Sequence, residues 1–129
     1  MPDLTDAYEN GKYIPDAASY APRWQALAAA YRTELGDRAE LDLRYGPNAR
    51  HCFDLFMPEC DPKGLLVFVH GGYWLAFDKS AWSHLSAGAL THGFAVAMPS
   101  YRLAPEARIS EITLDAVAAV EVAAGMVDG

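Results

Sequence analysis

The 129 residues are 52% hydrophobic, which is enough apolar material for one domain with a packed core. Ten Lys and Arg stand against seventeen Asp and Glu, so the formal net charge is -7. A chain with this charge offers no basic surface to phosphate groups, and we expect no nucleic-acid partner.

The first residues, "MPDLTDAYENGKY", are acidic and polar, whereas a secretory signal needs a basic start followed by an apolar stretch. The longest candidate for a membrane span, residues 117–127, is too short and contains Glu121. We therefore expect a cytoplasmic protein with no membrane partner. Cys52 and Cys60 do not make a disulfide framework, and we expect both to be reduced.

A metal site is not expected either. His51 lies beside Cys52, but His70, His84 and His92 lack the spacing of four residues that places two ligands on one helical face. No sequence motif indicates a cofactor.

An amphipathic helix is predicted over about residues 22–35. Pro22 suits a first helical position, and Gly36 suits the end. Between them, apolar side chains recur at helical spacing and predict one buried stripe: Trp24, Leu27, Ala28, Tyr31 and Leu35.

An antiparallel hairpin at a sheet edge is predicted next, over about residues 39–57. Apolar residues alternate with polar ones on both sides of the turn "GPN": Leu41, Leu43 and Tyr45 before it, and Phe53, Leu55 and Met57 after it.

The remaining part, residues 64–129, is predicted to alternate strands and helices. Residues 65–69 are all apolar, as in a strand of a parallel sheet that helices cover on both faces. Asp78 or Ser80 can cap a helix that runs to His92. A second buried strand, "FAVAM", follows, and then a last helix from Ser110 to about Ala124.

The stretch "VFVHGGYWLAFDKS" places His70, Gly71 and Gly72 where the first of these strands ends. Ligands collect at the carboxyl ends of parallel strands, and glycines leave backbone N–H groups unshielded. N–H groups aimed at one point stabilise the oxyanion of an acyl-transfer intermediate. The alternative is a tight turn with Trp74 and Phe77 as ordinary core aromatics.

"HGGYW" after one strand and "YRLAPEAR" after the next resemble two landmarks of α/β-hydrolases of the esterase and lipase type. Together with "DAYENGKYIPDAASYAPRW" and "FAVAMPSYRLAPEARISEIT", they resemble the arylformamidase (kynurenine formamidase-like) branch over roughly residues 6–124. The resemblance implies an α/β fold: the N-terminal part of an α/β-hydrolase, with an edge hairpin, parallel strands, flanking helices and an incomplete sheet.

The resemblance also implies roles for single residues. Gly71, Gly72 and Tyr73 would supply the backbone donors of the oxyanion hole, His70 would brace the loop, and Trp74 would line the pocket. Residues 101–106 would pack beneath the site. Tyr73 and Ser100 depart from the hormone-sensitive-lipase-like form, which favours the formamidase branch.

The family also needs a Ser in a G-x-S-x-G elbow, then an acid and a His, and we identify none of these in the 129 residues. "HLSAG" imitates the elbow, but His84 replaces the required Gly, and Ser86 lies inside a predicted helix. His84 and His92 are interpreted as solvent-facing or capping residues, and Asp115 as a partner of the helix dipole. We therefore expect this chain to be inactive alone.

The function implied by the resemblance is that of a serine hydrolase acting on a small formyl or acyl substrate, such as N-formylkynurenine. Two alternatives stay open: a general carboxylesterase, and a non-catalytic binding module that keeps only the loop. The expected partner is a second copy of the chain or a missing C-terminal half.

Overall fold

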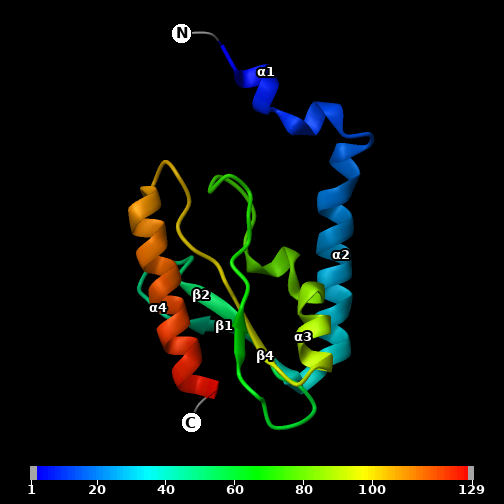
Figure 1. The fold of residues 1–129 in the computed structure, drawn as a ribbon, viewed down its shortest axis with the longest axis vertical. Helices are drawn as coiled ribbons and strands as arrows, with labels where there is room; N and C mark the ends of the chain where they lie inside the picture. The colour runs from blue at the N-terminus through cyan, green and yellow to red at the C-terminus, as the bar shows by residue number, and fades with distance from the viewer. Residues whose placement is uncertain (1–2, 128–129) are drawn as a thin grey trace.

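The computed structural model describes residues 3–127. A four-stranded sheet lies between helices on its two faces (Figure 1). Its strand order is β1-β2-β4-β3, with bounds Ala39–Arg44 for β1, Cys52–Phe56 for β2, Ala95–Pro99 for β4 and Leu65–Val67 for β3. β2 pairs antiparallel with both β1 and β4, and β3 pairs parallel with β4.

Two hydrophobic clusters pack against the sheet, one on each face. Helix α4, Ile109–Val127, covers one face, while α2, Ala17–Leu35, and α3, Ala87–Thr91, cover the other (Figure 1). The cluster beneath α4 consists of Phe53, Leu55, Ala95, Ala97 and Ala123. The cluster beneath α2 and α3 consists of Leu35, Phe56, Leu90, Val96 and Met98.

Strand β4 is the central element of the described sheet. All five of its residues are buried, so the buried strand predicted at 94–98 is confirmed with a shift of one residue. Ala95 and Ala97 face α4, whereas Val96 and Met98 face the other layer. This continuous burial explains why the strand reads as an unbroken apolar run.

Helix α2 begins five residues earlier than predicted, and Pro22 lies inside it. The rings of Tyr20 and Trp24 pack 5.9 Å apart across Pro22, which stabilises the turns that precede the proline. Ala28 and Leu35 are buried as expected. Leu27 is 54% exposed, because the sheet-facing side of α2 passes through Ala28 and Leu35 instead.

The single helix predicted from 78 to 92 is wrong. The chain forms two 3-10 turns, η3 (Lys79–Ala81) and η4 (Ser83–Ser86), before the short α3. Arg32 of α2 donates to the carbonyl of Ser80 at 2.6 Å and to Oγ of Ser83 at 2.7 Å. This carbonyl is one that a continuous α-helix would use for itself. The predicted cap is present, since Asp78 accepts from the N–H of Ser80 at 2.7 Å.

The predicted alternation holds only in part for the antiparallel pair. A bulge between Glu40 and Leu43, with Asp42 at φ 57°, turns Leu41 outward, and its side chain is 45% exposed. In β2 the alternation is absent, because residues 53–56 are all buried. Of these two strands, only β1 lies at an edge of the described sheet, since β2 has a partner on both sides.

Strand β3 is shorter and less covered than the run at 65–69 predicts. Within the described residues it pairs only with β4, and Leu66 and Val69 are 45% and 48% exposed. Helix α4 begins one residue before Ser110 and extends three residues past Ala124. Ser110 is therefore not its cap, and the carboxylate of Glu111 accepts from the N–H of Arg108 at 2.8 Å instead.

The remaining elements are short: α1, Thr5–Tyr8, η1, Asn10–Tyr13, and η2, Gly36–Arg38. Among residues 3–127, no helix has both the length and the apolar character that a membrane crossing requires.

Candidate active site

The loop of residues 70–77 leaves the carboxyl end of β3 and folds back on itself. Its turn is closed by a hydrogen bond from the N–H of Leu75 to the carbonyl of Gly72 at 3.0 Å. Four of its residues have positive φ: Gly72 at 123°, Tyr73 at 52°, Trp74 at 57° and Phe77 at 70°. A non-glycine residue in this region costs about 1–3 kcal/mol, so contacts from other elements must hold the loop.

Gly71 and Gly72 differ in how much space their surroundings leave for a side chain. A Cβ on Gly72 would lie 2.6 Å from the carbonyl oxygen of Ala76, in addition to the strain of its φ. A Cβ on Gly71 would have no neighbour within 4 Å. Gly72 is therefore required by the turn, whereas Gly71 leaves open space beside the backbone.

The backbone donors that the resemblance singles out are free. Among residues 3–127, no group accepts a hydrogen bond from the N–H of Gly71, Gly72 or Tyr73. These donors belong to consecutive residues of one tight loop at a strand end. They are chemically suited to bind an anionic oxygen.

His70 lies at the start of this loop and is held by Tyr101. The His70 side chain is buried, and its ring stacks on that of Tyr101 with centroids 4.5 Å apart. The Tyr101 hydroxyl donates to the carbonyl of His70 at 2.5 Å. Burial lowers the pKa of His70, although the 2.8 Å contact of Nδ1 with the carbonyl of Gly71 acts in the opposite direction. A neutral imidazole with its proton on Nδ1 fits this contact.

A second contact joins the same two loops. The N–H of Ala104 donates to the carbonyl of Trp74 at 2.8 Å. The segment 101–106 therefore contacts both the start and the middle of the loop 70–77. The side chains of Tyr73 and Trp74 themselves remain 66% and 45% exposed.

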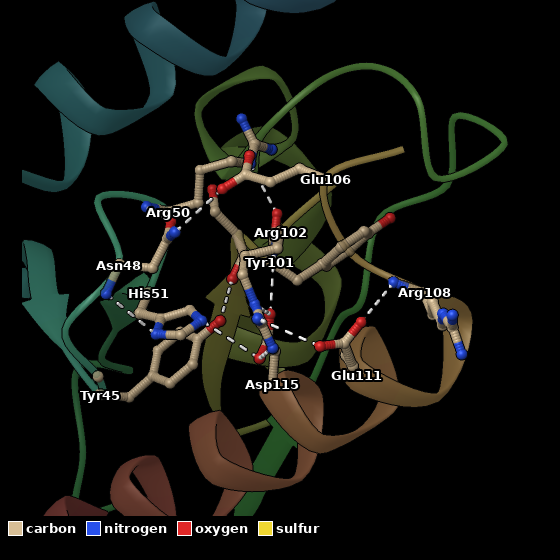
Figure 2. Close-up of polar contacts among 12 residues, drawn as sticks. Tyr45, Asn48, Arg50, His51, Tyr101, Arg102, Glu106, Arg108, Glu111 and Asp115 are labelled. Carbon is tan, nitrogen blue, oxygen red and sulfur yellow. Dashed lines mark hydrogen bonds and ion pairs between the residues drawn. The ribbon is translucent and has the colours of Figure 1, made fainter. Parts of the chain in front are cut away.

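Asp115 binds the segment that follows Tyr101, and its predicted role as a dipole partner is wrong. The carboxylate is 5% exposed and accepts three hydrogen bonds from Arg102, at 3.1 Å from the backbone N–H, 2.9 Å from Nε and 2.8 Å from Nη2 (Figure 2). Burial alone would raise its pKa, but the hydrogen bonds from Arg102 outweigh burial and lower it. Sequence alone does not show which cation faces this helix.

His51 reaches Asp115 from the turn between β1 and β2. Its Nδ1 accepts from the N–H of Asn48 at 3.2 Å, which leaves the proton on Nε2, 3.2 Å from Oδ1 of Asp115 (Figure 2). Nε2 has no hydrogen-bond partner among the described residues, so the approach to Asp115 is a close polar contact and not a hydrogen bond. His51 is thus part of a partly buried polar cluster with Asn48 and Asp115. Among residues 3–127, no group of three His, Cys, Asp or Glu side chains is placed to hold a metal ion.

Arg50 is a residue that the sequence analysis missed. It is partly buried and donates from Nε to the carbonyl of Tyr101 and from Nη2 to the carbonyl of Phe77, both at 2.6 Å (Figure 2 shows the first contact). Its partners are backbone atoms 27 and 51 residues away, so no local pattern indicates them.

The ion pair of Lys79 and Asp54 was missed as well, although the sequence carries a signal for it. Asp54 interrupts the apolar residues of β2, and a carboxylate at such a position needs a cation. Nζ of Lys79 lies 2.6 Å from Oδ1 of Asp54 and 2.7 Å from Oδ1 of Asp42. Burial would lower the pKa of Lys79, but the bonds to the two carboxylates raise it.

The remaining serine, histidine and cysteine candidates are not part of the loop 70–77. Ser86 is buried, and its hydroxyl donates to the carbonyl of Ser83 at 2.7 Å, so it is not at a strand-to-helix turn. His92 contacts the carbonyl of Gly88 through Nδ1 at 2.7 Å, as a helix-end residue does, while His84 is partly buried rather than solvent-facing. Cys52 and Cys60 are free.

A sequence profile described as the alpha/beta hydrolase fold matches residues 66–126. Kynurenine formamidase of Drosophila melanogaster is 35% identical over 72 residues, which are 54% of this chain and 24% of that protein. Isoprenylcysteine alpha-carbonyl methylesterase of Arabidopsis thaliana is 30% identical over 92 residues, 70% of this chain and 22% of that protein. The chain thus spans about a quarter of each of these relatives.

Solved structures extend the comparison to the whole chain. A protein assigned as a thioesterase from Silicibacter sp. TM1040 matches 100% of this chain with 61% identity and a TM-score of 0.95, and the chain covers 49% of it. Esterase B of Lactobacillus rhamnosis matches 92% of this chain with 21% identity and a TM-score of 0.63, and 38% of that protein is covered, which supports the fold alone. With the mixed sheet, its covering helices and the loop after β3, these similarities show that the chain carries part of the α/β-hydrolase fold.

Proposed function

We propose that this chain supplies the oxyanion-hole part of a serine hydrolase that acts on a formamide or a carboxylic ester. The observation that carries the proposal is the set of free N–H groups on Gly71, Gly72 and Tyr73 at the carboxyl end of β3. The nucleophilic Ser, the acid and the His base would come from residues outside these 129. This chain by itself would then not hydrolyse the substrate.

In the proposed reaction, negative charge develops on the carbonyl oxygen of the substrate as the nucleophile adds to its carbon. Backbone N–H groups that are already oriented stabilise this charge without reorganising in the transition state. Orientation comes from Tyr101, which holds the carbonyl of His70, and from Ala104, which holds that of Trp74. These contacts maintain backbone angles that the loop sequence does not favour.

The substrate is proposed to be a small molecule with an aromatic group beside the scissile carbonyl, as in N-formylkynurenine. The exposed rings of Tyr73 and Trp74 support this, because aromatic side chains next to polar donors are typical of small-molecule sites. The relative named kynurenine formamidase supports it as well. A general carboxylesterase is the second candidate, and the relative named as a methylesterase favours it. A binding module without catalysis is the third.

The test uses a fusion of this chain to the part of the Silicibacter protein that the chain does not cover. Its hydrolysis of N-formylkynurenine and of p-nitrophenyl acetate separates the candidates. Turnover of the formamide supports the first, and turnover of the ester alone supports the second. A folded fusion that binds a substrate analogue but turns over neither compound indicates the third.

Variants of the two glycines test the site itself. Gly72→Pro removes one donor and cannot adopt the φ of 123°, so kcat should fall by about 10²- to 10³-fold. Gly71→Ala meets no atom within 4 Å and should fold normally, while its methyl group occupies the space beside the donors. Gly88→Ala, on α3 and equally free of neighbours, is the matched control. Unchanged kcat in a folded Gly72→Pro variant would refute the assignment.

A further inference from the structure

Arg50 joins two loops that are far apart in the sequence. Its guanidinium donates to the carbonyl of Tyr101 and to that of Phe77, each at 2.6 Å. Phe77 ends the loop 70–77, and Tyr101 begins the segment beneath that loop. Hydrogen bonds from a charged donor to a neutral acceptor are stronger than neutral ones, so these two contacts are a substantial constraint on the backbone.

Together with the hydroxyl of Tyr101, the two contacts fix both ends of the loop. Tyr101 holds the carbonyl of His70, where the loop begins, and Arg50 holds the carbonyl of Phe77, where it ends. Arg50 also fixes the backbone of Tyr101 itself. Between these fixed ends lie Tyr73 and Trp74, whose backbones have positive φ. These contacts therefore limit how far the backbone of the loop can move.

We propose that Arg50 is a positioning residue, which keeps the N–H groups of Gly71, Gly72 and Tyr73 aimed at the substrate oxygen. The inference rests on the proposed function of those groups. An arginine suits the task because its planar fork presents donors to two acceptors at once, whereas a lysine places one compact charge on a flexible stem. Arg50 acts through the backbone and does not need to touch the substrate.

Arg32 provides the matched control. Like Arg50, it is a partly buried arginine that spans two segments through two short hydrogen bonds, to the carbonyl of Ser80 at 2.6 Å and to Oγ of Ser83 at 2.7 Å. It holds η3 and η4 against α2 and is not bonded to the loop 70–77. A general loss of stability should thus appear in variants of both arginines, while a positioning effect should appear only with Arg50.

The first measurement is residue-resolved amide hydrogen exchange on the fusion protein. Two bonded amides report on the loop: Leu75, bonded to the carbonyl of Gly72, and Ala104, bonded to that of Trp74. Arg50→Met and the charge-conserving Arg50→Lys should each speed their exchange about tenfold or more beyond any change in Arg32→Met, since local opening sets their protection. Unchanged exchange of both amides in folded Arg50→Lys would overturn the inference.

The second measurement is the kinetics of the fusion protein. Arg50→Ala should lower kcat by about 10- to 100-fold with little change in KM, because misplaced donors lose transition-state contacts and not ground-state binding. Added guanidinium ion at low millimolar concentration should restore part of kcat to Arg50→Ala, but none to Arg32→Ala. If Gly72→Pro lowers kcat and Arg50→Ala does not, this inference alone is wrong. If neither variant lowers kcat, the proposed function is wrong and the inference falls with it.

Discussion

The ring of Tyr101 stacks on the ring of His70 at an interplanar angle of 16°, and its hydroxyl donates to the His70 carbonyl at 2.5 Å. A buried aromatic pair thus joins the segment after β4 to the loop after β3. The hydroxyl makes this pair more than apolar packing, because it fixes the backbone at the start of the loop.

Tyr101→Phe keeps the stacked rings and removes only the hydroxyl. The carbonyl of His70 then loses its donor, and the free energy of unfolding should fall by about 1–2 kcal/mol in urea titrations. Tyr45→Phe is the control, because its hydroxyl bonds the carbonyl of Ser100 at 2.6 Å but does not reach the loop. Exchange of the Leu75 amide should increase in Tyr101→Phe alone; equal exchange in both variants would contradict a specific hold on the loop.

Because Lys79 and Asp54 form a buried ion pair, removing Lys79 alone should lower the free energy of unfolding more than removing both charges. Lys79→Met leaves the carboxylate of Asp54, which is 1% exposed, without its cation, and should cost about 3–5 kcal/mol of unfolding free energy. The double variant Lys79→Met/Asp54→Leu removes both charges and should recover most of that loss. The comparison requires thermal or urea unfolding of the two variants, and a double variant no more stable than Lys79→Met would show that charge is not the cause.

Asp115 should make stability depend on pH in the acid range. Because Arg102 holds the pKa of Asp115 below its ordinary value, the carboxylate binds protons more weakly in the folded state than in the unfolded state. Its contribution is therefore complete above the unfolded pKa of about 3.9, and it is lost as the pH falls through the lower folded value.

The measurement is the unfolding free energy at a series of pH values from about 2 to 6, for the original chain and for Asp115→Asn. The variant should be less stable at the upper end, and the difference between the two should shrink toward the lower end. A difference that is constant across the range would contradict this origin of the acid sensitivity.

The exposed edge of β3 should make the chain associate when it is isolated. This strand pairs only with β4 among the described residues, and Leu66 and Val69 remain about half exposed. An apolar strand with an unpaired edge is a template for pairing with another chain. We expect dimers or aggregates in size-exclusion chromatography, and a monodisperse complex with hydrolase activity when the part of the Silicibacter protein that this chain does not cover is added in trans. A stable monomer whose amides at 65–69 are strongly protected would contradict this expectation.

Ser86 should be irrelevant to catalysis. Its hydroxyl is buried and donates to the carbonyl of Ser83, so no substrate carbonyl can approach it without unfolding η4. Ser86→Ala should leave the hydrolysis of p-nitrophenyl acetate by the fusion protein unchanged, and the 129-residue chain should show only the background rate with either residue. Saturable turnover of the isolated chain that Ser86→Ala abolishes would overturn this assignment.

Local sequence patterns predict those elements whose structure depends mainly on one continuous stretch of chain. The apolar run of β4 and the glycine loop after β3 are of this kind. Distant partners decide the rest: Arg32 breaks the helix predicted over 78–92, and the bulge at Asp42 turns Leu41 outward. Arg50 and Asp115 bind groups that no sequence spacing identifies. The candidate loop and its contact with the segment 101–106 were thus predictable, while Arg50, which bonds to both, was not.

The central place of β4 has a consequence for how this chain folds. Both β2 and β3 pair with β4, yet β4 follows them in the sequence, so most of the sheet cannot form before residues 95–99 are available. A two-stranded hairpin of β1 and β2 alone is only marginally stable in water. Contacts between such distant segments slow folding, because loop closure must precede them. During synthesis, the strands within residues 39–67 therefore cannot complete their sheet before residues 95–99 have been made. Until then, their apolar side chains stay exposed and can be bound by chaperones.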